Sequence, residues 1–314
     1  MKVKYLFLAL IIGALFAACS AAPQASSVDE AEMVVFTSIV PQTYFVERIG
    51  GDLVEAVAMV EPGASPATYE PKPSQMAALE EAELYFSIGV PFEGAWLEKI
   101  ADANEEMEVI DTTEGIAKRV MTEEHSHDEE MEGEEHHDED HKGEENHDDH
   151  EEGVLDPHVW VSPALVKIQA QNIFDALVKI APEHEKTFKA NLDAFLVDIE
   201  VLEAEIESTL EGIASKKFMV FHPSWGYFAD EFGMEQIAIE VGGTEPSAAE
   251  LAELIEEAEH EGIKVVFAQP EFSTEDAATI AEAIEGEVIL ISPLAYNWLE
   301  NLQTVADTFA EVLE

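Results

Sequence analysis

Apolar and polar positions follow two periods along this chain. Short apolar runs predict strands, and between them apolar residues spaced three and four apart predict helices. The predicted strands are 33–37, 54–60, 84–88, 107–110, 218–221, 236–241, 265–268 and 288–291. The predicted helices are 43–49, 74–83, 93–103, 163–180, 183–210, 225–232, 247–260, 274–284 and one from about 298. Strands that alternate with helices predict an α/β fold with parallel sheets.

Two helix starts carry capping signals. Ser74 is a plausible N-cap for helix 74–83, and Ser247 with Glu250 three residues later forms the pattern of a capping box. Both signals place a helix directly after a loop, as an α/β fold requires.

One predicted helix is much longer than the others. Between about 183 and 210, large apolar residues recur every three or four positions, namely Phe188, Leu192, Phe195, Ile199, Leu202 and Ile206. At about 1.5 Å per residue this helix would be roughly 40 Å long, the size of a whole domain. We therefore expect two α/β lobes, 33–182 and 213–314, joined by a connecting helix over 183–212. Ligands of such sheets collect beyond the carboxyl ends of the strands.

The N-terminus has the pattern of an export signal. Lys2 and Lys4 precede an apolar stretch too short to span a membrane comfortably, and small residues then lead to Cys19, the single cysteine. Residues 1–19 are similar to a lipoprotein signal peptide whose cysteine is lipidated, except that Phe16 replaces the usual leucine. The alternative is an ordinary cleaved signal. We expect residues 20–32 to be a tether and the protein to be lipid-anchored on the outer face of the cytoplasmic membrane, in a periplasm or at the cell surface.

The charge of the chain narrows the range of partners. There are 68 Asp and Glu against 15 Lys and Arg, a net charge of −53, while 47% of the residues are hydrophobic and suffice for a core. The chain has no basic clusters of the kind that bind nucleic acid or anionic lipid. Residues 123–152 carry −16 of the charge, and the remaining −37 is typical of a solvated surface or of a saline habitat.

The acidic segment is also rich in histidine. An insert at 122–152 contains His125, His127, His136, His137, His141, His147 and His150 among carboxylates, with almost no apolar residues. Such a segment cannot bury a core, and we expect it to be disordered. Imidazole and carboxylate together suit borderline divalent metals, which predicts loose, auxiliary metal capture. A solvated loop without a role is the alternative.

Two further histidines are candidate ligands, because we expect both to lie at strand ends, where a sheet presents its ligand. His222 directly follows strand 218–221, and Pro223 ends that strand. His158 lies in the sequence Asp-Pro-His-Val-Trp. The remaining histidines, His184 and His260, lie on polar helix surfaces, and we interpret them as structural.

Several motifs together resemble the zinc/manganese solute-binding proteins of ABC transporters. They are Pro-Gly-Ala-Ser-Pro-Ala-Thr-Tyr-Glu-Pro at 62–71, the His-rich loop, Asp-Pro-His-Val-Trp-Val-Ser-Pro at 156–163, Phe-His followed by Trp-Gly-Tyr-Phe at 221–228, Phe-Ala-Gln-Pro-Glu-Phe at 267–272 and Ser-Pro-Leu at 292–294. The resemblance runs in order from about residue 33 to the end. It implies two lobes joined by a rigid helix, with a metal bound in the cleft and delivered to a membrane permease and its ATPase.

The resemblance also implies a ligand set, which this chain keeps only in part. The zinc-type proteins have three histidines and an acidic residue. His158 and His222 match two of them, whereas Ala67 and Ser292 stand at the other two positions. Alanine cannot bind a metal, and a neutral serine is a poor zinc ligand.

Other groups must complete the shell if the cleft binds metal tightly. Glu271 and Glu240 are candidate metal ligands, Glu70 is a third candidate, and a histidine of the insert is another. The remaining alternative is that the cleft no longer binds metal tightly.

The sequence therefore favours capture of a divalent transition metal and its delivery to an ABC importer. Two histidines favour zinc, because manganese prefers oxygen ligands, and manganese is the alternative metal. The alternative is an exported metal buffer or chaperone that acts through the insert, with a degenerate cleft. We find no His-Glu-x-x-His, no Gly-x-Ser-x-Gly and no phosphate-binding loop, and we expect a monomer that is not an enzyme.

Overall fold

The computed structural model describes residues 31, 33–121, 154–240, 244, 246–272 and 274–313. The predicted signal segment with Cys19, the tether apart from Ala31, and the insert at 122–152 with its seven histidines lie outside the described residues. None of the described helices combines the length and the apolar character needed to cross a bilayer.

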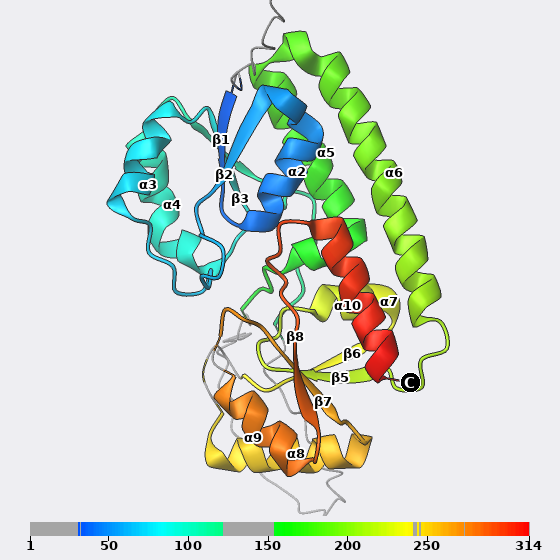
Figure 1. Ribbon diagram of the computed structural model, residues 1–314. Coiled ribbons are helices and arrows are strands. Elements are labelled where there is room, and N and C mark those ends of the chain that lie inside the picture. Colours follow the sequence, from blue (N-terminus) through cyan, green and yellow to red (C-terminus); the bar gives the residue numbers. More distant parts are fainter. Residues whose placement is uncertain are drawn as a thin grey trace, which may run out of the picture. The chain divides into compact units, whose positions relative to one another are not determined.

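The N-terminal lobe is built on a four-stranded parallel sheet. Its strands run in the order β2-β1-β3-β4, and they are β1 (Met33–Thr37), β2 (Val54–Ala58), β3 (Leu84–Ser87) and β4 (Glu108–Asp111). The helices of this lobe are α2 (Val40–Gly50), α3 (Pro73–Ala78), α4 (Pro91–Ala103) and α5 (Pro163–Ile180). Helices α2 and α5 cover one face of the sheet, and α3 and α4 cover the other (Figure 1).

The C-terminal lobe repeats this design. Its parallel sheet has the order β6-β5-β7-β8, with β5 (Lys217–Val220), β6 (Glu235–Ala238), β7 (Val265–Ala268) and β8 (Glu287–Leu290). Its helices are α7 (Gly226–Phe232), α8 (Ala248–Glu261), α9 (Glu275–Ala283) and α10 (Trp298–Val312). Figure 1 shows α8 and α9 on the outer face of this sheet, and α7 and α10 on the side toward the other lobe.

Helix α6 (Glu185–Leu210) joins the two lobes and confirms the predicted connector. It has 26 residues and is therefore about 39 Å long. All six apolar residues that predicted it are buried, and they face α2, α5 and α10. The fold class is thus confirmed: two α/β lobes with parallel sheets are joined by one long helix.

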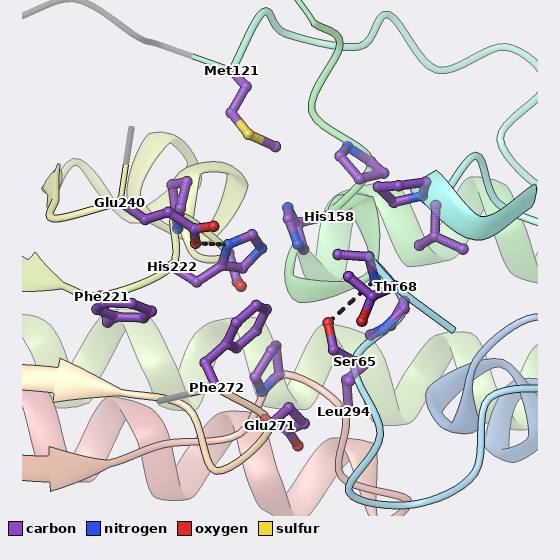
Figure 2. Close-up of a pocket in the computed structure, with 18 of the residues that line it drawn as sticks. Ser65, Thr68, Met121, His158, Phe221, His222, Glu240, Glu271, Phe272 and Leu294 are labelled. Carbon is purple, nitrogen blue, oxygen red and sulfur yellow. Dashed lines mark hydrogen bonds and ion pairs between the residues drawn. The ribbon is translucent and has the colours of Figure 1, made fainter. Parts of the chain in front are cut away.

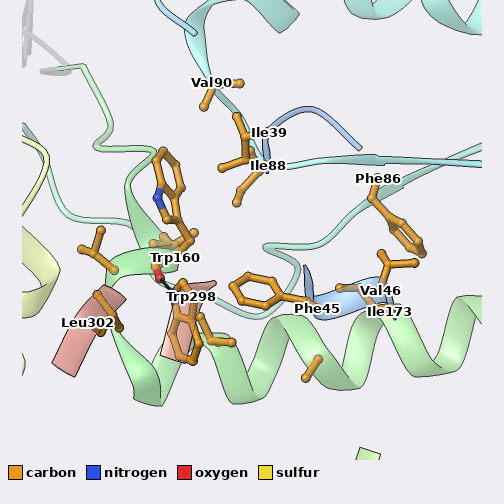
Figure 3. Close-up of a cluster of buried hydrophobic side chains, with 14 of the residues drawn as sticks. Ile39, Phe45, Val46, Phe86, Ile88, Val90, Trp160, Ile173, Trp298 and Leu302 are labelled. Carbon is orange, nitrogen blue, oxygen red and sulfur yellow. Dashed lines mark hydrogen bonds between the residues drawn. The ribbon is translucent and has the colours of Figure 1, made fainter. Parts of the chain in front are cut away.

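The main hydrophobic core continues from one lobe into the other. A single cluster of buried side chains includes Val35 and Phe45 of the N-terminal lobe together with Phe218 and Phe309 of the C-terminal lobe. Trp160 and Trp298 lie within this cluster where the lobes meet (Figure 3). A second, separate cluster lies between the C-terminal sheet and helices α8 and α9.

Helix ends differ from the prediction where proline begins a helix. Helix α2 starts at Val40 rather than 43, because Pro41 occupies its first turn, where no backbone donor is needed. Helix α3 likewise starts at Pro73, so Ser74 lies inside the helix and is not its N-cap. The predicted capping box at Ser247 is confirmed, since its hydroxyl accepts from the Glu250 amide at 3.3 Å and the Glu250 carboxylate accepts from the Ser247 amide at 2.6 Å.

Candidate metal centre

A cavity of about 490 Å³ lies where the carboxyl ends of both sheets face each other. The N-terminal lobe contributes residues 65–68 and 90–91, and the C-terminal lobe contributes 221–224, Glu240, 271–272 and 293–294. Met121, Val154, Pro157, His158 and Trp160 complete the wall. Most of this wall is apolar, and its two imidazoles lie side by side at the centre (Figure 2).

His222 is held by Gln269, Phe272 and Glu240. Gln269 accepts a hydrogen bond from the backbone amide of His222 at 3.2 Å and donates one to its carbonyl oxygen at 2.6 Å. The ring stacks on Phe272 with a centroid separation of 4.4 Å. Its Nδ1 lies 2.5 Å from the carboxylate Oε2 of Glu240. Burial lowers the pKa of His222, and the neighbouring Glu240 offsets this only in part. The metal-binding form, the neutral imidazole, is therefore favoured.

His158 is held by a carboxylate two residues before it. Oδ1 of Asp156 accepts from the backbone amide of His158 at 2.9 Å and lies 2.7 Å from its ring Nδ1. Burial works against ionisation of Asp156, but the hydrogen bonds of His158 and the charges of His158 and Arg119 outweigh it, so the pKa of Asp156 is lowered. Asp156 therefore remains an anion in a position that fixes the ring of His158.

The imidazole rings of His158 and His222 are held in the same way. Their centroids are 5.2 Å apart, and each Nδ1 has a carboxylate partner, which leaves both Nε2 atoms for a ligand in the cavity. Zinc-binding histidines in proteins are commonly oriented by a carboxylate on the other ring nitrogen. This pair therefore has the arrangement of half a zinc site.

The acidic candidates lie in different places. Glu240 contacts the Nδ1 of His222, on the side of the ring away from the free nitrogen. Glu271 lines the cavity, and its Oε1 accepts from the hydroxyl of Ser292 at 2.8 Å, whereas its Oε2 is buried without a hydrogen bond. Glu70 is exposed and does not line the cavity. Ala67 does line it.

The structure brings His158 and His222 together, but no larger group. Within the described residues, no three His, Cys, Asp or Glu side chains converge closely enough to hold a metal ion. His260, which we expected on a solvated helix surface, is 85% exposed.

Asp156 is a residue of the candidate site that the sequence did not single out, although it holds the ring of His158. The signal was an Asp two residues before a His, a spacing at which the carboxylate reaches the backbone amide and the ring together. The stacking residue Phe272 and the neighbours of Asp156 come from distant parts of the chain, and their contacts have no local signal.

Comparisons with known proteins show what the chain is similar to. A high-affinity zinc uptake system protein ZnuA of Yersinia pestis is 28% identical over 245 residues, which are 77% of each chain. A zinc-binding lipoprotein AdcA of Streptococcus pneumoniae is 27% identical over 94% of this chain, and this chain spans only 56% of AdcA. A crystal structure of ZnuA has a TM-score of 0.79 and 41% identity, covering 90% of this chain and 99% of the other.

The family comparison covers nearly all described residues. Residues 35–312 match the family whose description is "ZnuA: Zinc-uptake complex component A periplasmic". The match includes both lobes, the connecting helix α6 and both cavity histidines. The chain therefore belongs to the ZnuA family of periplasmic zinc-uptake components.

Proposed function

We propose that this protein captures a divalent transition metal, zinc foremost, in the cavity between its lobes and delivers it to an ABC importer. The observation that carries the proposal is the pair of imidazoles, each with Nδ1 held by a carboxylate and Nε2 left for a metal. Nitrogen ligands favour zinc over manganese, which prefers oxygen. The metal is cargo, and no chemical step is part of this function.

The cavity residues receive distinct roles in this proposal. His158 and His222 bind the metal directly, and Asp156 and Glu240 orient their rings and make them more basic. We thus assign Glu240 to His222 rather than to the metal. Glu271 remains the candidate third ligand, because it lines the cavity and one of its buried oxygens has no hydrogen bond. The seven histidines of the insert would gather cations near the cavity, since Met121 and Val154, on either side of the insert, both line it.

The proposed location is outside the cytoplasmic membrane. The N-terminal pattern supports a signal peptide with lipidation at Cys19, and the similarity to a lipoprotein of Streptococcus pneumoniae supports the lipid anchor. The protein would act there as a monomer that docks on a permease driven by an ATPase.

The test compares zinc affinity and stoichiometry in five forms of the protein. They are the parent, a deletion of 122–152, His158→Ala, His222→Ala and the control His260→Ala, which changes an exposed histidine far from the cavity. We expect tight binding of one zinc in the parent, the deletion form and the control, and its loss in the two cavity variants. Loss of all tight binding with the insert would instead support the metal-buffer alternative and refute the cavity.

A further inference from the structure

Arg119 contacts both lobes, next to Asp156, the carboxylate that holds His158. Its Nη1 donates to Oδ2 of Asp230 on α7 at 2.7 Å, and its Nε lies 3.8 Å from Oδ2 of Asp156. The side chain is 25% exposed, and Asp156 is only 3% exposed. One guanidinium therefore lies between a carboxylate of the C-terminal lobe and the carboxylate that holds His158.

Tyr227 makes the backbone contact at the same place. The amide of Arg119 donates to the hydroxyl of Tyr227 at 3.0 Å, and this hydroxyl donates to the carbonyl oxygen of Asp156 at 2.9 Å. The guanidinium carbon lies 5.9 Å from the centre of the Tyr227 ring. Burial raises the pKa of Tyr227 to about 12, so the hydroxyl keeps the proton that it donates.

The first residue of α7 leaves room for the guanidinium. A Cβ at Gly226 would lie 2.7 Å from Nη1 and 2.9 Å from Cζ of Arg119. Any side chain at this position would displace the arginine. Gly226 lies four residues after His222, so the same short segment carries the second imidazole and receives Arg119.

Arg119 and Asp156 are also neighbours along the backbone. The amide of Asp156 donates to the carbonyl oxygen of Arg119 at 2.9 Å, next to an antiparallel bridge between Val120 and Leu155. The two carboxylate oxygens of Asp156 then divide their contacts, with Oδ1 on His158 and Oδ2 toward Arg119. Contacts thus run without a gap from Asp230 through Arg119 and Asp156 to the ring of His158.

We propose that Arg119 is a positioning residue of the metal site, which holds Asp156, and through it His158, in place against α7. The inference rests on the metal-binding function proposed above. Loss of Arg119 frees Asp156 to rotate and lets His158 shift relative to His222, which weakens metal binding although Arg119 never contacts the metal. Changing a partner of a ligating histidine commonly costs ten- to hundredfold in metal affinity, and Arg119 acts one contact further out.

The chain provides a matched control in its only other arginine. Arg48 is 27% exposed, donates to Asp198 at 2.6 Å and lies 4.9 Å from the ring centre of Phe195, but it is far from the cavity lining. The test compares Arg119→Gln, Gly226→Ala and Arg48→Gln. For each form we would measure zinc affinity by competition with a chromophoric chelator, the visible spectrum of bound Co²⁺, and the thermal midpoint without metal.

The expected result separates position from stability. Arg119→Gln weakens zinc binding about tenfold and changes the Co²⁺ spectrum. Gly226→Ala, which displaces the arginine without removing its charge, changes both in the same direction. Arg48→Gln lowers the thermal midpoint but leaves affinity and spectrum as in the parent. In an Asp156→Asn background, Arg119→Gln adds less than about threefold, because the contact through which it acts is already gone.

Two outcomes overturn the inference, and a third concerns the function beneath it. An unchanged affinity and spectrum in Arg119→Gln, while His222→Ala loses zinc, refutes the role of Arg119 and leaves the metal site standing. A full tenfold loss in the Asp156→Asn background refutes the route through Asp156. If His222→Ala itself keeps tight zinc binding, the proposed function fails, and the role of Arg119 fails with it.

Discussion

Trp298 offers a direct test of how the lobes are held together. Its indole nitrogen donates to the carbonyl oxygen of Trp160 at 2.6 Å, and the indole of Trp160 donates to the carbonyl oxygen of Pro293 at 2.8 Å. The Trp298 ring is 1% exposed and packs edge-on against Phe45 at 5.2 Å between centroids. The substitution Trp298→Phe keeps an aromatic ring there but removes the donor.

The expected loss can be worked out from these contacts. A buried carbonyl oxygen that loses its hydrogen bond costs about 1–3 kcal/mol. The smaller ring buries less apolar area, which costs about 1 kcal/mol more at about 25 cal/mol per Å². We therefore expect Trp298→Phe to lower the free energy of unfolding by about 2–4 kcal/mol.

Urea unfolding of the metal-free protein in the presence of a chelator measures this loss. The slope with urea should stay constant, so that the midpoint alone reports stability. Trp96→Phe is the control, because Trp96 is only half-buried and the ammonium of the exposed Lys99 lies over its ring at 4.1 Å from the centroid. A Trp298→Phe protein as stable as Trp96→Phe would refute the argument that this indole joins the lobes.

Two further predictions concern the cavity. Ala67→His adds an imidazole to the wall of the cavity that holds His158 and His222, and should tighten zinc binding at least about tenfold, since a direct ligand should matter no less than an outer partner. An unchanged chelator-competition curve would contradict this. The lowered pKa of His222 means that the unfolded chain takes up a proton near pH 6.5 while the folded chain does not. The contribution of His222 to the stability of the metal-free protein should therefore be fully present above pH 6.5 and be lost as the pH falls through the lowered folded pKa. Thermal melts between pH 7.5 and 5 should show a flatter profile for His222→Gln than for the parent. Parallel profiles of the two proteins would count against the burial of a neutral imidazole.

Much of the fold could be predicted from local pattern. The residues that predicted the long helix, from Phe188 to Ile206, are all buried in α6, because a stripe with helical spacing has one stable solution against neighbouring helices. Strand β7 and helix α5 have the predicted bounds, Val265–Ala268 and Pro163–Ile180. Helix starts were less certain, since Pro41 and Pro73 are as compatible with a first turn as with the loop before it.

The sequence predicted the two histidines of the site but not the contacts that hold them. His222 could be placed at the cavity because it closely follows β5, and parallel strands present their carboxyl ends at one edge of the sheet. The expectation of a strand end was wrong for His158, which directly precedes the short helix 159–161 and was placed at the cavity by its motif alone. The sequence could not show which ring nitrogen of His222 contacts Glu240, because that depends on the rotation of the side chain. Arg119 was equally hidden, since its contacts with Tyr227 and Asp230 join residues more than a hundred positions apart.

The contact between Phe45 and Trp298 has a consequence for the order in which the molecule forms. Phe45 lies on α2, and Trp298 begins α10, the last helix among the described residues. Phe45 is synthesised long before Trp298, so the core around Phe45 stays incomplete until Trp298 has been added to the chain. Contacts this distant in sequence also slow folding. The core around Phe45 is therefore completed only after α10 has been synthesised.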